Sequence, residues 1–290
     1  MPELPEVETV RRGLHDLIIG RIIAAETHDT PKGFPNAPAD VEAFVLGATV
    51  TAVKRRAKVL LIELSTDYTL VIHLKMTGQL VFVADKSRFG AGHPSDSLIG
   101  SLPDRSTRVT FDFTDGSQLF FNDQRKFGWV KLYPTIEVPM IDFMRKVGPE
   151  PLDDAFTADV FYDRLQRRKN TTIKAAILDQ TVLAGVGNIY ADEGLWGAKI
   201  HPATRVKDVP RTKVVDLWRE IREVMSLAIE KGGSTDKNYV NAEGKRGSYM
   251  DFARVFRREG QSCLRHPDSE IEKIRVAGRG THICPVCQVL

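Results

Sequence analysis

The chain of 290 residues is long enough for two separately packed domains. Its 42% hydrophobic and 27% charged residues are typical of a globular protein rather than a disordered one. No apolar run approaches the roughly 20 residues of a membrane span, and the first residues lack the pattern of a signal peptide, so we expect a cytoplasmic protein with no membrane partner. The net charge of +3 is only weakly basic. Lysine and arginine nevertheless concentrate at residues 54–58, 164–169 and 254–279, which favours a phosphate-bearing partner.

The first half of the sequence predicts a β-rich domain. Apolar residues at helical spacing predict a helix over residues 4–14, and a second short helix is expected at residues 40–46. Strands are predicted at residues 21–25, 50–55, 59–64, 69–74, 80–83, 109–113, 119–121 and 129–132. Residues 85–107, rich in Gly, Ser, Asp and Pro, predict a long surface loop. Many short strands with few helices favour a β-sandwich over residues 1–134.

The second half predicts helices followed by a hairpin. Two prolines within residues 147–151 indicate a linker, which we place at residues 135–151. Helices are predicted at residues 155–166, 172–179, 188–197 and 212–231, and two glycines end the last of them. A β-hairpin with its tip at residues 278–280 follows. We therefore expect a two-domain α+β chain whose C-terminal part comprises a helical domain over residues 152–250 and a hairpin over residues 251–290.

All three cysteines lie near the C-terminal end, and their spacing predicts a metal site. Cys263 and His266 form one C-x-x-ligand pair, and Cys284 and Cys287 form another. Two such pairs can supply the four N and S ligands of one tetrahedral Zn²⁺ per chain. His282 is a competing fourth ligand, but His266 repeats the spacing of the other pair. Because four protein ligands leave no position for water, this zinc is expected to be structural.

The N-terminal residues include a candidate nucleophile. Removal of Met1 would expose the secondary amine of Pro2, which can form a Schiff base with an aldehyde-level carbon. The carboxyls of Glu3 and Glu6 could then move protons beside it. The alternative is that Pro2 merely precedes a helix and Glu3 complements the helix dipole. On the chemistry alone, this structural interpretation is preferred.

Three motifs, placed near the start, in the middle and at the end of the chain, favour the catalytic interpretation of Pro2 instead. They are Pro2-Glu-Leu-Pro-Glu-Val-Glu-Thr-Val-Arg11, Leu183-Ala-Gly-Val-Gly-Asn-Ile-Tyr-Ala-Asp-Glu193 and the cysteine hairpin. Together they resemble the formamidopyrimidine-DNA glycosylases, the Fpg (MutM) branch of the Fpg/Nei family, and Leu4 is more typical of this branch than of the endonuclease VIII branch. The resemblance implies a zinc-finger DNA-repair enzyme that acts as a monomer on damaged double-stranded DNA. It would excise oxidised purines (8-oxoguanine and formamidopyrimidines) through a Pro2 Schiff base, then cleave the backbone by β,δ-elimination as an AP lyase.

The resemblance also implies roles for individual residues. Its catalytic set comprises the nucleophile, a proton carrier and two phosphate-holding cations, at Pro2, Glu3, Lys58 and Arg279 respectively. Excision requires the damaged base to rotate out of the duplex, which leaves a gap to be filled. The DNA-binding set contains the three gap-filling residues Met76, Arg125 and Phe127, together with His73, Lys174 and the phosphate-holding Asn188. Residues 153–198 would form the helix–two-turn–helix element, and residues 232–249 the lesion-recognition loop.

Two departures from the family pattern stand out. His266 replaces a cysteine, with a gap between the metal pairs one residue longer than usual, and Arg257 stands where glycine is usual, a strained choice if the backbone there needs positive φ. Two other functions compete with the preferred one. An endonuclease VIII-like enzyme would prefer oxidised pyrimidines, a choice that the lesion-recognition loop would decide. A non-catalytic damaged-DNA-binding protein would have no need of Pro2, Glu3 and Lys58.

Overall fold

The computed structural model describes residues 1–85, 87–93, 95–234 and 248–290, which form two compact units. The first contains Met1–Arg145 with Lys231–Ser248, and the second contains Lys146–Glu230 with Tyr249–Leu290. The described residues 231–234 and 248, predicted to belong to the helical domain, are therefore grouped with the first unit. Most of the predicted lesion-recognition loop (residues 235–247) lies outside the described residues. Among the described helices, none is long and apolar enough to span a membrane.

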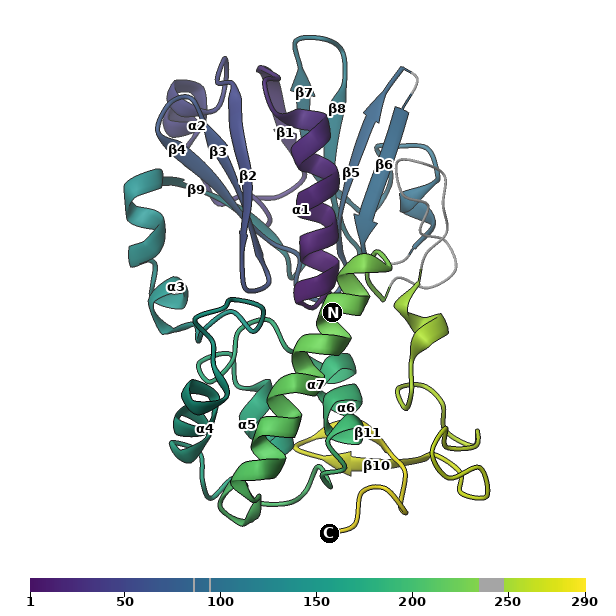
Figure 1. The fold of residues 1–290 in the computed structure, drawn as a ribbon. Coiled ribbons are helices and arrows are strands. Elements are labelled where there is room, and N and C mark those ends of the chain that lie inside the picture. The colour runs from purple at the N-terminus through teal and green to yellow at the C-terminus, as the bar shows by residue number, and fades with distance from the viewer. Residues whose placement is uncertain (86, 94, 235–247) are drawn as a thin grey trace. The chain divides into compact units, whose positions relative to one another are not determined.

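The first unit is built on two antiparallel sheets, as predicted (Figure 1). One sheet has four strands in the order β2-β3-β4-β9, and the other has five in the order β1-β7-β8-β5-β6. The strands are β1 (Ile23–His28), β2 (Val50–Arg56), β3 (Val59–Leu64), β4 (Tyr68–His73), β5 (Gly78–Ala84), β6 (Ser87–Gly92), β7 (Thr107–Phe113), β8 (Gln118–Asp123) and β9 (Trp129–Pro134). The helices are α1 (Leu4–Ile18), α2 (Pro38–Phe44), α3 (Asp142–Lys146) and the short η1 (Asp96–Leu98) and η2 (Thr135–Met140).

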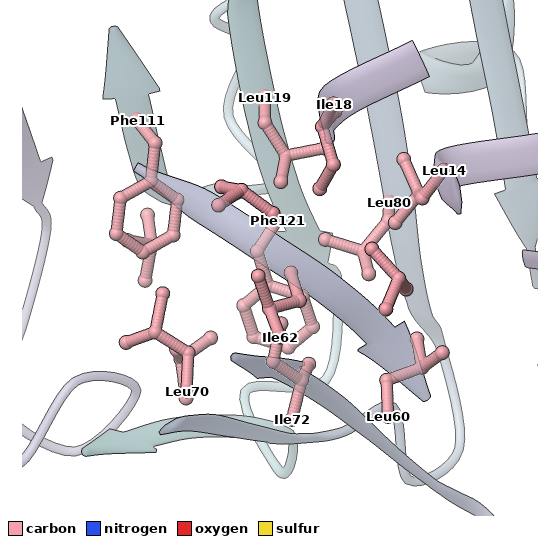
Figure 2. Close-up of a cluster of buried hydrophobic side chains, with 14 of the residues drawn as sticks. Leu14, Ile18, Leu60, Ile62, Leu70, Ile72, Leu80, Phe111, Leu119 and Phe121 are labelled. Atoms are coloured by element: carbon pink, nitrogen blue, oxygen red, sulfur yellow. The ribbon is translucent and has the colours of Figure 1, made fainter. Parts of the chain in front are cut away.

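A single apolar core joins both sheets to α1. Leu60 and Ile62 of β3 and Phe121 of β8 bring the two sheets to this core, and Leu14 and Ile18 bring the buried face of α1 to the same cluster (Figure 2). Alternate residues of these strands face this core, such as Leu80 and Phe82 of β5 and Leu119 and Phe121 of β8, which is the alternation of side chains that a sandwich requires. The core fixes the ends of its strands, where the candidate site residues of this unit lie.

Two connecting segments contain more regular structure than expected, and the prediction of a loop over residues 85–107 was wrong. The region 85–107 was predicted as a loop, but it contains β6, whose glycines allow close packing rather than a turn. A Cβ at Gly90 would lie 3.0 Å from the Leu98 side chain. The linker predicted at 135–151 contains η2 and α3, where Val138, Ile141 and Phe143 cover β3 and β4 in an apolar cluster. Turn-forming composition and prolines concealed these packing roles.

The second unit is helical with a C-terminal hairpin. Its elements are α4 (Ala158–Gln166), α5 (Ile173–Leu178), α6 (Asn188–Gly197), η3 (Val206–Asp208), α7 (Arg211–Glu230), η4 (Tyr249–Phe252), β10 (Glu272–Val276) and β11 (Arg279–Ile283). Helix α6 packs against α5, α7 and β11. The side chains of Thr157 and Thr172 cap α4 and α5 by accepting hydrogen bonds from the backbone N–H of Val160 and Ala175. The hairpin is therefore attached to a helical frame.

Candidate functional site

The start of the chain is fixed by hydrogen bonds at the N-terminus of α1. Glu3 and Glu6 form a capping box, in which the Glu6 carboxylate accepts the Glu3 backbone N–H at 2.7 Å. The second Glu6 oxygen accepts the backbone N–H of Ser234 at 2.8 Å. Pro2 is buried, as are both carboxylates. This arrangement holds Pro2 and Glu3 in one geometry where a chain terminus would otherwise fray.

The turn between β2 and β3 carries Lys58 and is connected to the same helix. Ala57 adopts a left-handed backbone conformation at φ 51°. The guanidinium of Arg55 donates to the Ala57 carbonyl at 2.9 Å and to the Glu8 carboxylate of α1 at 3.2 Å. Lys58 itself is only 5% exposed. The lysine predicted to hold a phosphate therefore lies on a turn that is tied to the helix that follows Pro2 and Glu3.

His73 ends β4 in a largely apolar environment. Its Nδ1 accepts the backbone N–H of Lys75 at 3.0 Å, and its ring lies 5.8 Å from that of Trp129. Burial, followed by the positive charges of Lys75 and Lys58, lowers the pKa of His73 to about 3. His73 is therefore neutral at physiological pH, so it would meet DNA as an uncharged group.

Two loops carry the predicted gap-filling residues. Met76 lies half-buried in the turn between β4 and β5, while Arg125 and Phe127 are exposed in the loop between β8 and β9. The Arg125 guanidinium lies 4.9 Å from the centre of the Phe127 ring, which keeps the two side chains stacked. Because β5 and β8 are neighbours in the five-stranded sheet, with Gly78 paired to Asp123, the two loops emerge side by side.

In the second unit, Asn188 and Arg279 come together through the hairpin. Asn188 begins α6, and its side-chain amide donates to the Gly280 carbonyl at 3.0 Å. Arg279 begins β11 and is exposed. The N-terminus of a helix attracts anions, and an arginine can donate two hydrogen bonds to a phosphate. This pair of residues can therefore grip one phosphate.

Lys174, in contrast, has no accessible surface, and its predicted DNA-binding role stays a prediction. Its ammonium donates at 2.6 Å to the Asp192 carboxylate and at 2.6 Å to the Thr281 hydroxyl. Lys174 and Asp192 are both 0% exposed. The second Asp192 oxygen accepts the backbone N–H of His282 at 2.9 Å. This buried ion pair attaches the hairpin strand that begins with Arg279 to α5 and α6.

A second buried carboxylate, also missed from the sequence, organises the segment that follows η4. Glu193 is 0% exposed, and its oxygens accept the backbone N–H groups of Arg254, Val255 and Phe256 at 2.8–3.1 Å. The Tyr249 hydroxyl donates to it at 2.9 Å. Burial, with the negative charge of Glu193, raises the pKa of Tyr249 far above its usual value, so this tyrosine stays a donor. Two acids within an otherwise apolar helix, α6, were the available signal.

The four predicted metal ligands converge as expected. The ligand atoms of Cys263, His266, Cys284 and Cys287 lie within 4.8 Å of one another. The Cys263 and Cys287 sulfurs are 3.8 Å apart, the separation of about 3.8 Å expected for thiolates about 2.3 Å from a tetrahedral zinc. His282 instead contacts Asp192 at 3.1 Å and Glu259 at 2.9 Å. The residues form a Cys₃His structural zinc site, and the choice of His266 over His282 agrees with the geometry.

Arg257 shows the backbone conformation that its usual glycine would favour. Its φ is 58°, in the left-handed region that side chains with a Cβ rarely adopt. The side chain is exposed, and its guanidinium lies 5.8 Å from the centre of the Phe256 ring. The strain expected from the sequence at this departure is therefore present.

Comparison with known proteins gives a consistent result along the chain. Family models match the formamidopyrimidine-DNA glycosylase N-terminal domain at residues 1–130, the formamidopyrimidine-DNA glycosylase H2TH domain at residues 147–239, and the zinc finger found in FPG and IleRS at residues 269–289. The formamidopyrimidine-DNA glycosylase of Herpetosiphon aurantiacus is 43% identical, over 99% of this chain and 100% of its own length. That of Latilactobacillus sakei is 39% identical, over 100% of this chain and 98% of its own.

Solved structures agree. A complex of Lactococcus lactis Fpg with DNA containing an abasic site superposes with a TM-score of 0.87 at 34% identity, covering 99% of this chain and 100% of the other. A complex of the wild-type Lactococcus lactis enzyme with DNA containing N7-benzyl-Fapy-dG gives a TM-score of 0.87 at 35% identity, with both chains fully covered. The chain described here belongs to the formamidopyrimidine-DNA glycosylase family.

Proposed function

We propose that this chain is a bifunctional DNA glycosylase and AP lyase that excises oxidised purines from duplex DNA as a monomer. The observation that carries the proposal is the fixed geometry of Pro2 and Glu3 at the N-terminus of α1. An unacylated Pro2 is a secondary amine, and a secondary amine can attack a sugar carbon and form an iminium ion. Relatives in complex with Fapy-dG and abasic-site DNA support the class of substrate.

In the proposed reaction, the Pro2 nitrogen attacks C1′ of the damaged nucleotide and the bond from C1′ to the base breaks. Glu3 protonates the ring oxygen as the sugar opens, which leaves an iminium between Pro2 and C1′. Loss of a C2′ proton then expels the 3′ phosphate, and a second elimination expels the 5′ phosphate. Hydrolysis of the iminium returns Pro2 to its amine. Lys58 and, on the second unit, Asn188 and Arg279 hold backbone phosphates during these steps.

Borohydride trapping on a duplex with 8-oxoguanine tests the nucleophile. Protein lacking Met1 should form a covalent complex through the Pro2 nitrogen, whereas protein that retains Met1 should form none, because an acylated proline nitrogen is not nucleophilic. Peptide mapping identifies the modified residue. Equal trapping by protein that retains Met1 would refute the proposal, and a panel of oxidised pyrimidines in the same assay identifies an endonuclease VIII-like preference instead.

A matched pair of variants separates proton transfer from helix capping. Glu3→Gln and Glu6→Gln each remove one carboxylate of the capping box. Only Glu3→Gln should lose the roughly 10²–10⁴-fold that general acid–base catalysis supplies, with DNA binding retained. Equal losses of excision rate in the two variants would show that Glu3 acts only through the helix.

Phosphate holding is tested by the salt dependence of duplex binding. Arg279→Ala should reduce the slope of log affinity against log salt by about 1, because one phosphate contact is lost. Lys273→Ala, which removes another hairpin cation that instead pairs with Glu259 at 3.3 Å, is the control. An unchanged slope in Arg279→Ala would show that Arg279 does not contact a DNA phosphate.

A further inference from the structure

The two loops that carry Met76, Arg125 and Phe127 share one buried carboxylate. Asp123, the last residue of β8, is 0% exposed. One of its oxygens accepts the backbone N–H groups of Phe127 and Gly128 at 2.8 and 2.6 Å. The other accepts the hydroxyl of Thr77 and the backbone N–H of Arg125, the latter at 3.2 Å. A single side chain therefore binds both loops.

Thr77 completes the connection. Its hydroxyl donates to Asp123 and accepts the backbone N–H of Arg125 at 3.0 Å. Because Thr77 directly follows Met76, the hydroxyl joins the first loop to the backbone of the second. Among the described residues, no side-chain pair other than Thr77 and Asp123 joins these two turns by a hydrogen bond.

The arrangement also holds an unfavourable backbone. Lys126 adopts φ 56°, and its neighbours on both sides, Arg125 and Phe127, donate their N–H groups to Asp123. At Gly128 a Cβ would lie 2.6 Å from the Phe121 ring and 3.1 Å from the carboxylate, so the loop must come this close to Asp123. Strained conformations persist only where the surrounding contacts determine them. Here the carboxylate supplies those contacts, which makes the position of the Phe127 ring depend on Asp123.

We propose that Asp123, with Thr77, is a positioning group that sets Met76, Arg125 and Phe127 as one rigid wedge for the gap left by the extruded base. The inference rests on the proposed function, since it assumes that these three residues enter the duplex. Asp123 touches no reacting atom. It acts by presetting the wedge, so that base extrusion does not have to order two separate loops. Misplacement of about 1 Å in a positioned group can cost roughly 100-fold in rate.

The chemistry of the hydrogen bonds predicts how two variants should differ. In Asp123→Asn, the amide oxygen can still accept from Phe127 and Gly128, while the amide nitrogen faces the Thr77 hydroxyl, which can turn to accept it. The Arg125 N–H then loses its carboxylate partner. Asp123→Ala loses all four acceptor contacts. Thr77→Val keeps the shape of the side chain but breaks the link between the loops.

The test compares excision of a paired 8-oxoguanine with nicking at a preformed abasic site, in single turnovers. An abasic nucleotide has no base to unpair, so its extrusion needs the wedge least. Asp123→Ala and Thr77→Val should lower excision about 10- to 100-fold, Asp123→Asn should lower it less, and nicking should fall less than about threefold in each. In stopped-flow experiments, the fluorescence change of a 2-aminopurine beside the lesion reports base extrusion, and its rate should fall in parallel with the rate of excision. Asp115→Asn is the matched control, since its carboxylate accepts the Ser117 N–H at 3.0 Å in the turn at the opposite end of β8.

The outcomes are distinct. Equal losses of excision and nicking, or unchanged 2-aminopurine kinetics, would overturn the inference and leave Asp123 a structural residue. If Phe127→Ala also leaves excision unchanged, the gap-filling function itself fails. If Phe127→Ala lowers excision while Thr77→Val and Asp123→Ala do not, only the positioning role fails. The double variant of Asp123→Ala with Phe127→Ala should lose less of the logarithm of the excision rate than the two single variants lose together, because both changes act through the Phe127 ring.

Discussion

Replacing Lys174 with methionine is the most informative perturbation of the second unit. The change keeps the aliphatic stem but removes the ammonium that donates to Asp192 and Thr281. Asp192 then remains as a carboxylate with no exposed surface and no cation at 2.6 Å. Removing one member of a buried pair costs about 3–5 kcal/mol. Asp192 keeps the backbone N–H of His282 at 2.9 Å, so we expect a loss near the lower end, about 3 kcal/mol.

The assay is denaturant unfolding of the zinc-loaded protein in a Trp129→Phe background. The chain has three tryptophans, and Trp196 and Trp218 both belong to the second unit, so the remaining fluorescence reports that unit. The neutral pair Lys174→Gln with Asp192→Asn retains a hydrogen bond and should lose only about 1–2 kcal/mol. A loss below about 1 kcal/mol in Lys174→Met would refute the reasoning, because it would mean that the carboxylate needs no cation.

Three further outcomes are expected. His266→Ala should lower the zinc content below one per chain by elemental analysis, whereas His282→Ala should retain it; the reverse would exchange the two assignments. Arg257→Gly should raise the thermal midpoint, because it relieves a left-handed conformation worth about 1 kcal/mol; an unchanged or lower midpoint would mean that the arginine contacts outweigh the strain. The His73 pKa is about 3, below its unfolded value of about 6.5, so its contribution to stability is complete above pH 6.5 and is lost as the pH falls towards 3. Between pH 7.5 and pH 5 the free energy of unfolding of the wild type should fall by about 2 kcal/mol more than that of His73→Asn, as measured by denaturant titrations. The same dependence on pH in the two proteins would refute the lowered pKa of His73.

Periodicity predicted the elements whose faces differ in polarity. Helices α1 and α7 are the clearest cases, because each buries one apolar face, with Val7, Val10 and Leu14 on α1 and Leu217 and Ile221 on α7. It failed at β6, where glycines serve close packing, and at η2 and α3, where prolines precede an apolar cluster. In both places local composition indicates a turn while the tertiary neighbours impose an element.

The metal site was predictable because its chemistry is local in sequence, with each pair of ligands three residues apart. The buried carboxylates were not predictable. Asp123, Asp192 and Glu193 look like solvated acids in the sequence, and their roles depend on donors from distant segments, such as the N–H of His282 or the hydroxyl of Thr77. The burial of Lys174 was not predictable for the same reason, because its partners Asp192 and Thr281 lie far from it along the chain.

The order of strands in the first unit has a consequence for biosynthesis. His28 of β1 pairs with Val109 of β7, and Tyr68 of β4 pairs with Pro134 of β9. At a translation rate of about 5–20 residues per second, β1 waits roughly 4–16 s for the roughly 80 residues up to its partner. During that interval the unpaired backbone groups of β1 are exposed to other nascent chains. The α4–α6 segment needs no such wait, because its neighbouring helices follow one another along the chain. Overexpression should therefore yield aggregates whose protected amides lie in the N-terminal strands.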